Sequence, residues 1–282
     1  MINIITDTTS GLPPEIAKRY HIPIIPQIIN FDNKSYYEVI DLDNPTFMRM
    51  LKASKELPKT AAPPPELFIM EFNKILPSEG TIFCIHPSAE ISGTVRSALM
   101  AAQEFPSADI RVIDTRSIGS SLATIVQLAA EWASNGEDAD SIENRIKQMI
   151  PRNRIYFMVD TLEYLAKGGR IGGATALLGT VLKIKPILAL SDGRVDQFEK
   201  ERTQKNAINR LIELVKSQAS RDGDAYISVM HAAVPDSARE FAGRLCSEFG
   251  LDSIPILDVP PAIVVHGGPG ILAAAFFTGG SI

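Results

Sequence analysis

The amino-acid sequence predicts an α/β protein of two lobes, with a mainly parallel sheet between helices on both faces in the first lobe and a mixed sheet in the second. Short β-branched runs alternate with longer amphipathic segments, which is the pattern of βαβ units. Most of these runs are apolar at nearly every position, as in parallel strands that are covered on both faces. The Asp192-Gly193 pair lies between two further runs and predicts an antiparallel hairpin in the second lobe.

Seven runs have the length and composition of buried strands, at residues 3–6, 81–85, 110–113, 155–159, 184–190, 226–230 and 262–265. Between them, apolar residues recur at helical spacing, for example from Ser92 and from Ile208. A polar helical segment ends before Pro151. We therefore expect an N-terminal lobe at residues 1–152 and a C-terminal lobe at residues 153–282.

Composition and charge argue against several classes of protein. The net charge is −5, from 28 basic and 33 acidic side chains without a Lys/Arg block, so nucleic acid is not the expected partner. The two cysteines, Cys84 and Cys246, lie in apolar contexts and are expected to be reduced. The four histidines lack metal-ligand spacing, so no metal is expected. Neither a leader peptide nor a membrane span is recognisable, which predicts a cytoplasmic protein with at most transient membrane contact.

The first candidate site is the polar loop that follows the predicted strand at 81–85. Ser92 is expected at or near the N-cap of the next helix, where the first backbone N–H groups lack internal partners. The small residues Ser92 and Gly93 would let an anion approach these N–H groups closely. The loop therefore suits a carboxylate or a phosphate, although an ordinary serine cap has the same pattern.

Three further stretches place polar residues among glycines or prolines. Gly168 is expected to end a helix in the left-handed conformation, with Arg170 on the turn that follows. His266 follows the predicted strand at 262–265, and three of the next four residues are glycine, which indicates positive φ or close backbone approach. Thr60 lies on a proline-rich approach to another helix. Each of these residues also has an ordinary structural interpretation.

The order of these motifs resembles the DegV family nearly end to end. The opening segment is similar to its T-D-S/T-x-x-D-L-P signature, with Gly11 where aspartate is common. Residues 92–94 match S-G-T, residues 112–115 match V-I-D-S/T, and residues 162–171 match L-x-Y-L-x-K-G-G-R-I. Residues 184–193 match I-K-P-I-L followed by D-G, and residues 266–270 match H-x-G-P-G. In the usual T-S-Q-P-S segment, Thr60 is kept but Ala61-Ala62-Pro63 replaces the polar part.

The resemblance implies a DegV-like fold in which a long-chain fatty acid such as palmitate is held between the two lobes, with no other cofactor. It implies that the C-terminal lobe supplies much of the acyl pocket and that the protein is a carrier, not an enzyme. Family members of this type present the acid to a separate fatty-acid kinase, which phosphorylates the carboxyl group. The residues that the resemblance places at the head group are Thr60, Ser92, Gly93, Thr94, Arg170 and His266.

Other functions compete with the carrier hypothesis. The main alternative is a serine-dependent acyl hydrolase or transferase with Ser92 as nucleophile and His266 as base, although no G-x-S-x-G elbow is present. A phosphosugar or nucleotide site at Ser92 lacks the glycine-rich phosphate motifs. A protein-interaction module is neither favoured nor excluded. The apolar residues Ile91, Leu177, Leu178 and Ile184 are suggested as lining the acyl tail.

Overall fold

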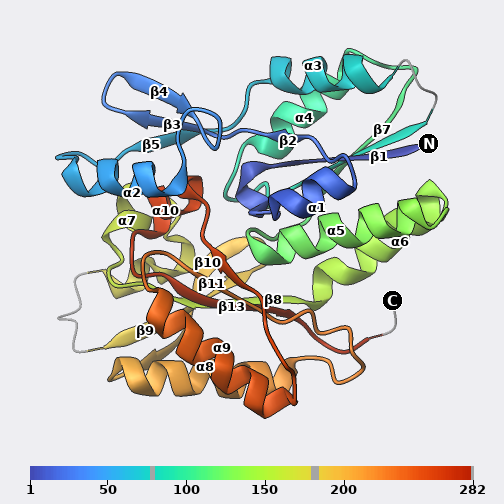
Figure 1. The fold of residues 1–282 in the computed structure, drawn as a ribbon. Coiled ribbons are helices and arrows are strands. Elements are labelled where there is room, and N and C mark those ends of the chain that lie inside the picture. Colours follow the sequence, from blue (N-terminus) through green and yellow to red (C-terminus); the bar gives the residue numbers. More distant parts are fainter. Residues whose placement is uncertain (77–79, 179–183, 281–282) are drawn as a thin grey trace. The chain divides into compact units, whose positions relative to one another are not determined.

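The computed structural model describes residues 1–76, 80–178 and 184–280 (Figure 1). The chain divides into two compact units. The first unit comprises Met1–Ile150 together with Pro260–Ala262, and the second comprises Pro151–Val259 with Ile263–Ile282. The two units are described separately below.

The first unit is built on a four-stranded parallel sheet of order β2-β1-β6-β7, as the continuous apolar runs predict. Its strands are β1 (Ile2–Asp7), β2 (Ile24–Ile25), β6 (Thr81–His86) and β7 (Asp109–Asp114). Helices cover both faces, which confirms the expected layers (Figure 1). One face carries α3 (Pro65–Ile75) and α4 (Thr94–Gln103), and the other carries α5 (Ser120–Ser134) and α6 (Ala139–Met149).

A small antiparallel sheet of order β4-β3-β5, absent from the sequence prediction, completes the first unit. It consists of β3 (Ile28–Phe31), β4 (Lys34–Tyr37) and β5 (Lys59–Ala61). Two helices, α1 (Pro14–Arg19) and α2 (Asn44–Ala53), precede and follow β3 and β4 along the chain. Thr60 therefore lies in a strand, opposite Ile29, and not on a loop.

The second unit holds a six-stranded mixed sheet of order β10-β9-β8-β13-β11-β12, in which only β11 and β12 are parallel. The mixed sheet was predicted, and so was the β9–β10 hairpin, whose Asp192 and Gly193 have φ of 48° and 78°. The strands are β8 (Asn153–Met158), β9 (Lys185–Ser191), β10 (Arg194–Glu201), β11 (Ser228–His231), β12 (Ile256–Asp258) and β13 (Leu272–Phe277).

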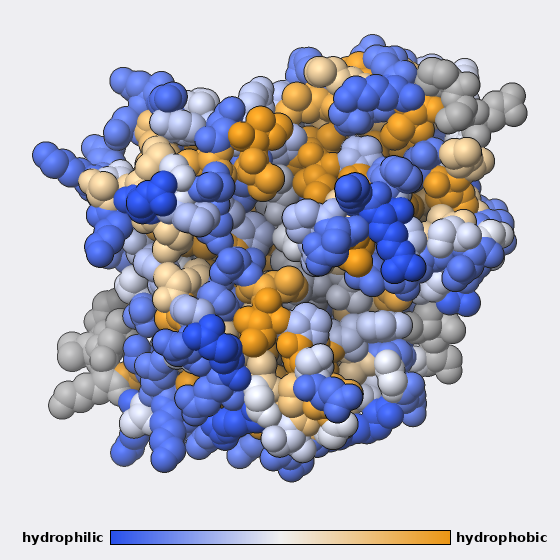
Figure 2. Space-filling model, viewed as in Figure 1, coloured by the Kyte–Doolittle hydropathy of each residue, from blue (hydrophilic) through white to orange (hydrophobic). Residues whose placement is uncertain are grey.

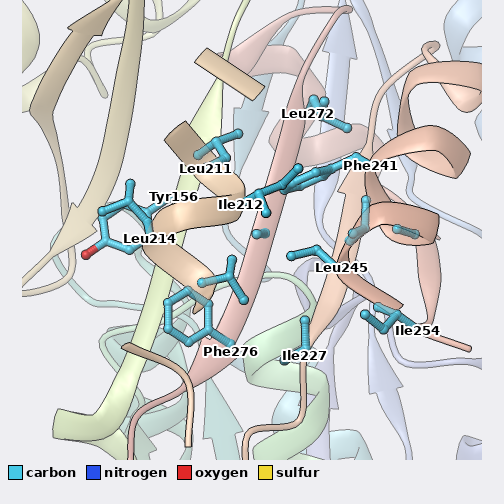
Figure 3. Close-up of a cluster of buried hydrophobic side chains, with 14 of the residues drawn as sticks. Tyr156, Leu211, Ile212, Leu214, Ile227, Phe241, Leu245, Ile254, Leu272 and Phe276 are labelled. Atoms are coloured by element: carbon cyan, nitrogen blue, oxygen red, sulfur yellow. The ribbon is translucent and has the colours of Figure 1, made fainter. Parts of the chain in front are cut away.

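The core of the second unit lies between this sheet and two fifteen-residue helices, α8 (Gln204–Gln218) and α9 (Pro235–Phe249) (Figure 3). Leu211 and Val215 from α8 and Phe241 and Leu245 from α9 belong to one buried cluster, and all four are fully buried. The helical spacing of these apolar residues is what the sequence shows from Ile208 onward. The short helix α7 (Glu163–Lys167) and the 3-10 helix η3 (Gly172–Leu177) lie between β8 and β9 in the chain.

In the C-terminal region one strand prediction is wrong and one strand was missed. Residues 262–265 are not a strand but part of helix α10 (Pro261–Gly267), which begins with proline at its first position. A four-residue apolar run cannot distinguish a strand from a buried helix turn by periodicity alone. The strand lies later, at β13, where the sequence Leu-Ala-Ala-Ala-Phe-Phe has the composition of a helix. Pairing with β8 and β11 on both sides makes it a strand.

Polar residues predominate on the face in Figure 2, and apolar residues there form separate patches. In the part of the chain that the structure describes, no helix combines the length and apolar character needed to cross a bilayer.

Glu38 is a fully buried carboxyl group in the first unit. It accepts hydrogen bonds from the Thr8 hydroxyl and from the backbone N–H of Ala262 at 2.9 Å, in the first turn of α10. Burial raises the pKa of Glu38 to about 7, because loss of solvent outweighs the two hydrogen bonds, and the nearby Asp7 adds to the rise. Glu38 therefore joins the segment after β4 to the beginning of α10, and its burial disfavours the ionised form of the carboxyl group.

We expect stability to fall as pH rises from about 4.5 to about 7, because the folded protein keeps a proton on Glu38 that the unfolded chain has already lost. The contribution should total about 3 kcal/mol and level off above the folded pKa. Glu38→Gln, which keeps an oxygen for the Ala262 N–H, should remove it. Urea unfolding of both proteins between pH 5 and pH 8 measures the difference. Glu240→Gln, on the exposed surface of α9, is the control and should keep the pH dependence of the wild-type protein. If the stabilities of Glu38→Gln and of the wild-type protein change in parallel with pH, the assignment to Glu38 is wrong.

Candidate functional site

The polar site of the first unit lies where parallel strands end. The carboxyl ends of β1 and β6 meet at the same edge of the sheet, and each ends in a titratable residue, Asp7 and His86. Both side chains are fully buried. In open α/β sheets this edge is where ligands bind, because the loops that follow the strands converge there.

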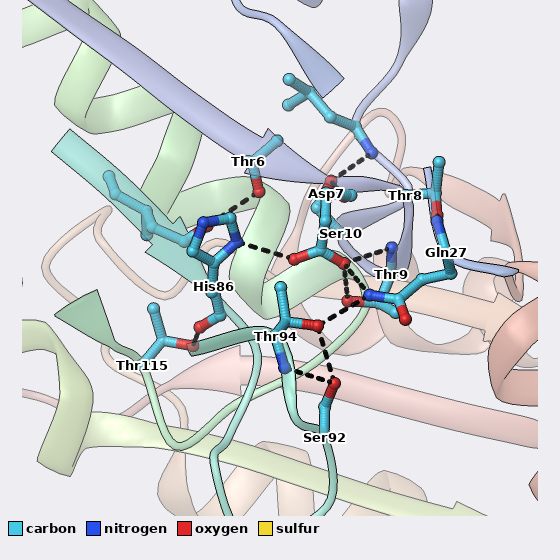
Figure 4. Close-up of polar contacts among 12 residues, drawn as sticks. Thr6, Asp7, Thr8, Thr9, Ser10, Gln27, His86, Ser92, Thr94 and Thr115 are labelled. Carbon is cyan, nitrogen blue, oxygen red and sulfur yellow. Dashed lines mark hydrogen bonds and ion pairs between the residues drawn. The ribbon is translucent and has the colours of Figure 1, made fainter. Parts of the chain in front are cut away.

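Asp7 is the centre of a hydrogen-bond network (Figure 4). Its Oδ1 accepts from the Thr9 backbone N–H at 3.0 Å, from the Thr9 hydroxyl at 2.6 Å and from Gln27 Nε2 at 3.0 Å. Its Oδ2 lies 2.9 Å from His86 Nδ1, and the rings of Phe68 and His86 pack in a T-shaped arrangement with their centroids 5.3 Å apart. Among the described residues, His86 Nε2 has no hydrogen-bond partner. The carboxyl group is thus enclosed by donors from three separate segments.

Gln27 connects this network to the S-G-T loop. Its Nε2 also donates to Thr94 Oγ1 at 2.8 Å, and Thr94 Oγ1 lies 2.8 Å from Ser92 Oγ. Gln27 and Thr94 are buried, whereas Ser92 is only half-buried. A continuous chain of hydrogen bonds therefore runs from buried Asp7 to the hydroxyl of the half-buried Ser92.

The N-cap of α4 is Gly93, not Ser92, and it has no side-chain capping bond. Ser92 lies one residue earlier, and its Oγ accepts the Thr94 backbone N–H at 3.3 Å. Gly93 also lies close to the strand that carries Thr60, since a Cβ added to Gly93 would lie 3.2 Å from the Cβ of Ala62. The structure thus brings the Ser92–Thr94 loop and the end of β5 together, while the sequence placed them thirty residues apart.

Arg170 and His266 lie in the second unit and meet at Gly168. Arg170 Nη1 donates to the Gly168 carbonyl oxygen at 2.8 Å, and a Cβ on Gly168 would lie 2.3 Å from His266 Nδ1. Gly168 has φ of −77°, so its expected left-handed conformation is wrong, and Gly169, with φ of 69°, has that role instead. Position 168 needs glycine because the His266 ring occupies the space of a side chain.

His266 lies near the end of helix α10, not at the end of a strand. Burial lowers its pKa to about 4, and the charge of Arg170 contributes to the fall. At neutral pH the ring is therefore uncharged and can donate one hydrogen bond and accept one. The expected positive φ in the glycine-rich turn is confirmed at Gly268 and Gly270, with φ of 78° and 89°.

Sequence reasoning missed most of the buried part of this site. Asp7 lies within the quoted opening motif, so a signal for it existed, and His86 directly follows the predicted strand at 81–85 and ends β6. Gln27 and Glu38 lie in ordinary surroundings, and only the fold brings them to the carboxyl edge. No motif or periodicity marks either residue.

The residues suggested for the acyl tail have different environments. Leu177 is buried and Leu178 is exposed, and Ile91 is half-buried in the loop before Ser92. Ile184 lines a small cavity in the second unit, of about 90 Å³, together with Asp160, Lys185 and their neighbours. Within the described residues, no group of three or more His, Cys, Asp or Glu side chains is placed to hold a metal ion.

Comparison with known proteins relates this arrangement to one family. The model of the DegV family, described as "Uncharacterised protein, DegV family", matches residues 1–279. A DegV domain-containing protein of Clostridium acetobutylicum is 32% identical over 98% of both chains. Another from Streptomyces coelicolor is 36% identical over 96% of both chains.

Solved structures agree with the sequence comparison. A DegV family protein from Thermus thermophilus, described by its fatty acid binding, has a TM-score of 0.90 and 28% identity, over 98% of this chain and 99% of that chain. A fatty acid binding DegV family protein from Streptococcus agalactiae has a TM-score of 0.90 and 30% identity, over 99% of both chains. In sequence along its whole length and in fold, this chain belongs to the DegV family.

Proposed function

We propose that this protein binds a long-chain fatty acid and presents its carboxylate to a separate fatty-acid kinase. The proposal is supported by relatives of the same fold, at 28% and 30% identity, that are described as fatty acid binding. The observation that carries it in this chain is the hydroxyl of the half-buried Ser92, held by Thr94 at the carboxyl edge of a parallel sheet. A hydroxyl in this position can donate to an anionic head group.

The surroundings of Ser92 suit a carboxylate. Gly93 brings backbone close to the ligand position without a side chain, and α4 begins immediately after it, so its first N–H groups and positive dipole end face the same loop. We propose that Thr60, on the neighbouring β5, supplies a second hydroxyl. In the second unit, Arg170 supplies a positive charge and the neutral ring of His266 supplies a hydrogen-bonding group. Both are groups that can bind a carboxylate.

The tail should set the affinity, and the head-group residues should set the orientation. Burying a methylene contributes about 0.8 kcal/mol, so some 14 of them give on the order of 11 kcal/mol before ordering costs. A hydrogen bond to a charged group adds about 1.5–3 kcal/mol, and desolvation of the carboxylate offsets part of this. A carrier with this balance retains its ligand when a single head-group contact is lost.

A carrier also fits the hydrogen bonding of Ser92 better than a hydrolase. A serine nucleophile needs a base within hydrogen-bond reach of its oxygen. Ser92 Oγ is bonded to the hydroxyl and the backbone N–H of Thr94, and His86, the buried histidine of this unit, is bonded to Asp7. His266, the base of the hydrolase alternative, lies in the second unit with its Nδ1 against Gly168. We therefore propose that Ser92 binds the acid and that the partner kinase performs the chemistry.

Protein purified from its own host should contain bound lipid. Mass spectrometry of an organic extract is expected to show about one long-chain acid per chain, and the delipidated protein should take up palmitate again. Incubation with acyl esters, without any partner, should release no product. Extracts without acyl chains together with failure to load palmitate, or hydrolysis of the esters, would contradict the proposal.

Ser92→Ala should separate binding from presentation. Losing one head-group contact while the tail stays buried is expected to weaken palmitate binding by less than about fivefold. Phosphorylation of the bound acid by a fatty-acid kinase should fall by at least about tenfold, because the carboxylate is no longer held in one orientation. Ser134→Ala, at an exposed serine at the end of α5, is the matched control. Equal losses of binding and of turnover would show that Ser92 does not orient the head group.

A further inference from the structure

We propose that Gln27 is a positioning residue that makes the Ser92 hydroxyl a hydrogen-bond donor toward the ligand, and so gives the site its preference for a carboxylate over an uncharged head group. This inference rests on the proposed function, since it concerns how the same site distinguishes its ligand. It follows from the direction of each hydrogen bond between Asp7 and Ser92.

The first step fixes which end of the Gln27 amide faces Asp7. Asp7 Oδ1 already accepts the backbone N–H and the hydroxyl of Thr9, so it is an acceptor toward Gln27 as well. Only the NH₂ end of an amide can donate, and the oxygen end would face a carboxylate oxygen without a proton between them. The Gln27 NH₂ group must therefore point at Asp7.

The second step uses the two hydrogens of this NH₂ group. One goes to Asp7 Oδ1 at 3.0 Å and the other goes to Thr94 Oγ1 at 2.8 Å. Thr94 Oγ1 thus receives a hydrogen bond from Gln27, and its own hydroxyl hydrogen is available for its other neighbour. That neighbour is Ser92 Oγ, 2.8 Å away.

The third step concerns the Ser92 oxygen. Either hydroxyl could donate across the 2.8 Å pair, but among the described residues the buried Thr94 hydroxyl bonds to Gln27 and Ser92 alone, so Ser92 Oγ is the acceptor for its hydrogen. Ser92 Oγ then accepts that hydroxyl and the Thr94 backbone N–H at 3.3 Å, which uses both of its lone pairs. The Ser92 hydrogen then points away from the network, toward the ligand. A carboxylate accepts such a hydrogen bond in charge-assisted form, whereas an alcohol gains only an ordinary bond.

Burial makes this arrangement rigid. Asp7 and Thr94 are fully buried and Gln27 is 3% exposed, so no solvent competes for the Gln27 amide. The Gln27 backbone is fixed as well, since its N–H donates to Thr8 Oγ1 at 3.0 Å and its carbonyl oxygen accepts the Glu38 N–H at 2.9 Å. Reversal of the Gln27–Thr94 hydrogen bond would require a different side chain at position 27, and reversal of the Thr94–Ser92 bond would leave the buried Thr94 hydrogen without an acceptor among the described residues.

Two substitutions test the inference through ligand preference. Gln27→Glu is nearly isosteric. The one carboxyl proton of the new glutamate is expected to lie toward Asp7, so a glutamate oxygen would accept the Thr94 hydroxyl. Thr94 Oγ1 would then accept the Ser92 hydroxyl, whose hydrogen would point to Thr94 and not to the ligand. Gln27→Met removes both donors. Affinities for palmitate and for 1-hexadecanol, which share the same tail, are measured by displacement of a fluorescent fatty acid. We expect the palmitate-to-hexadecanol affinity ratio to fall by about threefold to fivefold in both variants, as in Ser92→Ala, with hexadecanol binding changed by less than about 1.5-fold.

The controls separate this role from a structural one. Gln127→Met removes a similar amide-to-carboxylate bond on α5, to Glu131, and should leave the ratio unchanged. In a Ser92→Ala background, Gln27→Met should have no further effect on the ratio, because the group that it orients is gone. Thermal unfolding confirms that each variant is folded at the assay temperature.

The outcomes are distinct. Folded Gln27 variants with the wild-type ratio would overturn the inference. An unchanged ratio in Ser92→Ala would also overturn it, even if neither Gln27 variant folds. If the wild-type protein binds neither palmitate nor hexadecanol, the proposed function itself is wrong. If the wild-type protein binds palmitate and the Gln27 variants keep its affinity ratio, only the role of Gln27 is wrong.

Discussion

The acceptor character of one buried carboxyl group, Asp7, determines how the polar site of the first unit is organised. The side chain ends β1 and receives hydrogen bonds from Thr9, Gln27 and His86, which come from three segments of the chain. A buried carboxyl group is costly unless such donors surround it. Once its oxygens are acceptors, the amide of Gln27 has one orientation, and the hydroxyls of Thr94 and Ser92 follow in order. A constraint in the core thus determines the chemistry offered near the surface.

A second buried acid, Glu38, connects to the same region by another path. Thr8, next to Asp7 in the chain, donates its hydroxyl to Glu38 and accepts the backbone N–H of Gln27. Glu38 in turn accepts the N–H of Ala262 at the beginning of α10, the helix that carries His266 near its other end. The network that orients Ser92 is therefore continuous with the contact that fixes the first turn of this helix. Polar groups in this core specify geometry more than they add stability.

The sequence predicts the layers of the fold and part of the candidate site, and it fails for features that only tertiary contacts create. Apolar runs and helical spacing locate β1, β6 and α4, and the motif order locates Ser92 and His266. The β13 strand was missed because its alanines have helical propensity and only pairing on both sides makes it extended. Gln27 was missed because a lone glutamine has no local signal. The glycine at position 168 was explained by a left-handed backbone conformation, whereas the reason for it is the close contact with the His266 ring.

The most direct measurement of this account is a neutron or atomic-resolution X-ray structure of the protein with palmitate bound, in which hydrogens are visible. We expect one carboxylate oxygen within hydrogen-bond distance of Ser92 Oγ, the serine hydrogen pointing to it, and both hydrogens of the Gln27 NH₂ group on Asp7 and Thr94. A carboxylate bound away from Ser92, or a serine hydrogen directed at Thr94, would contradict the account.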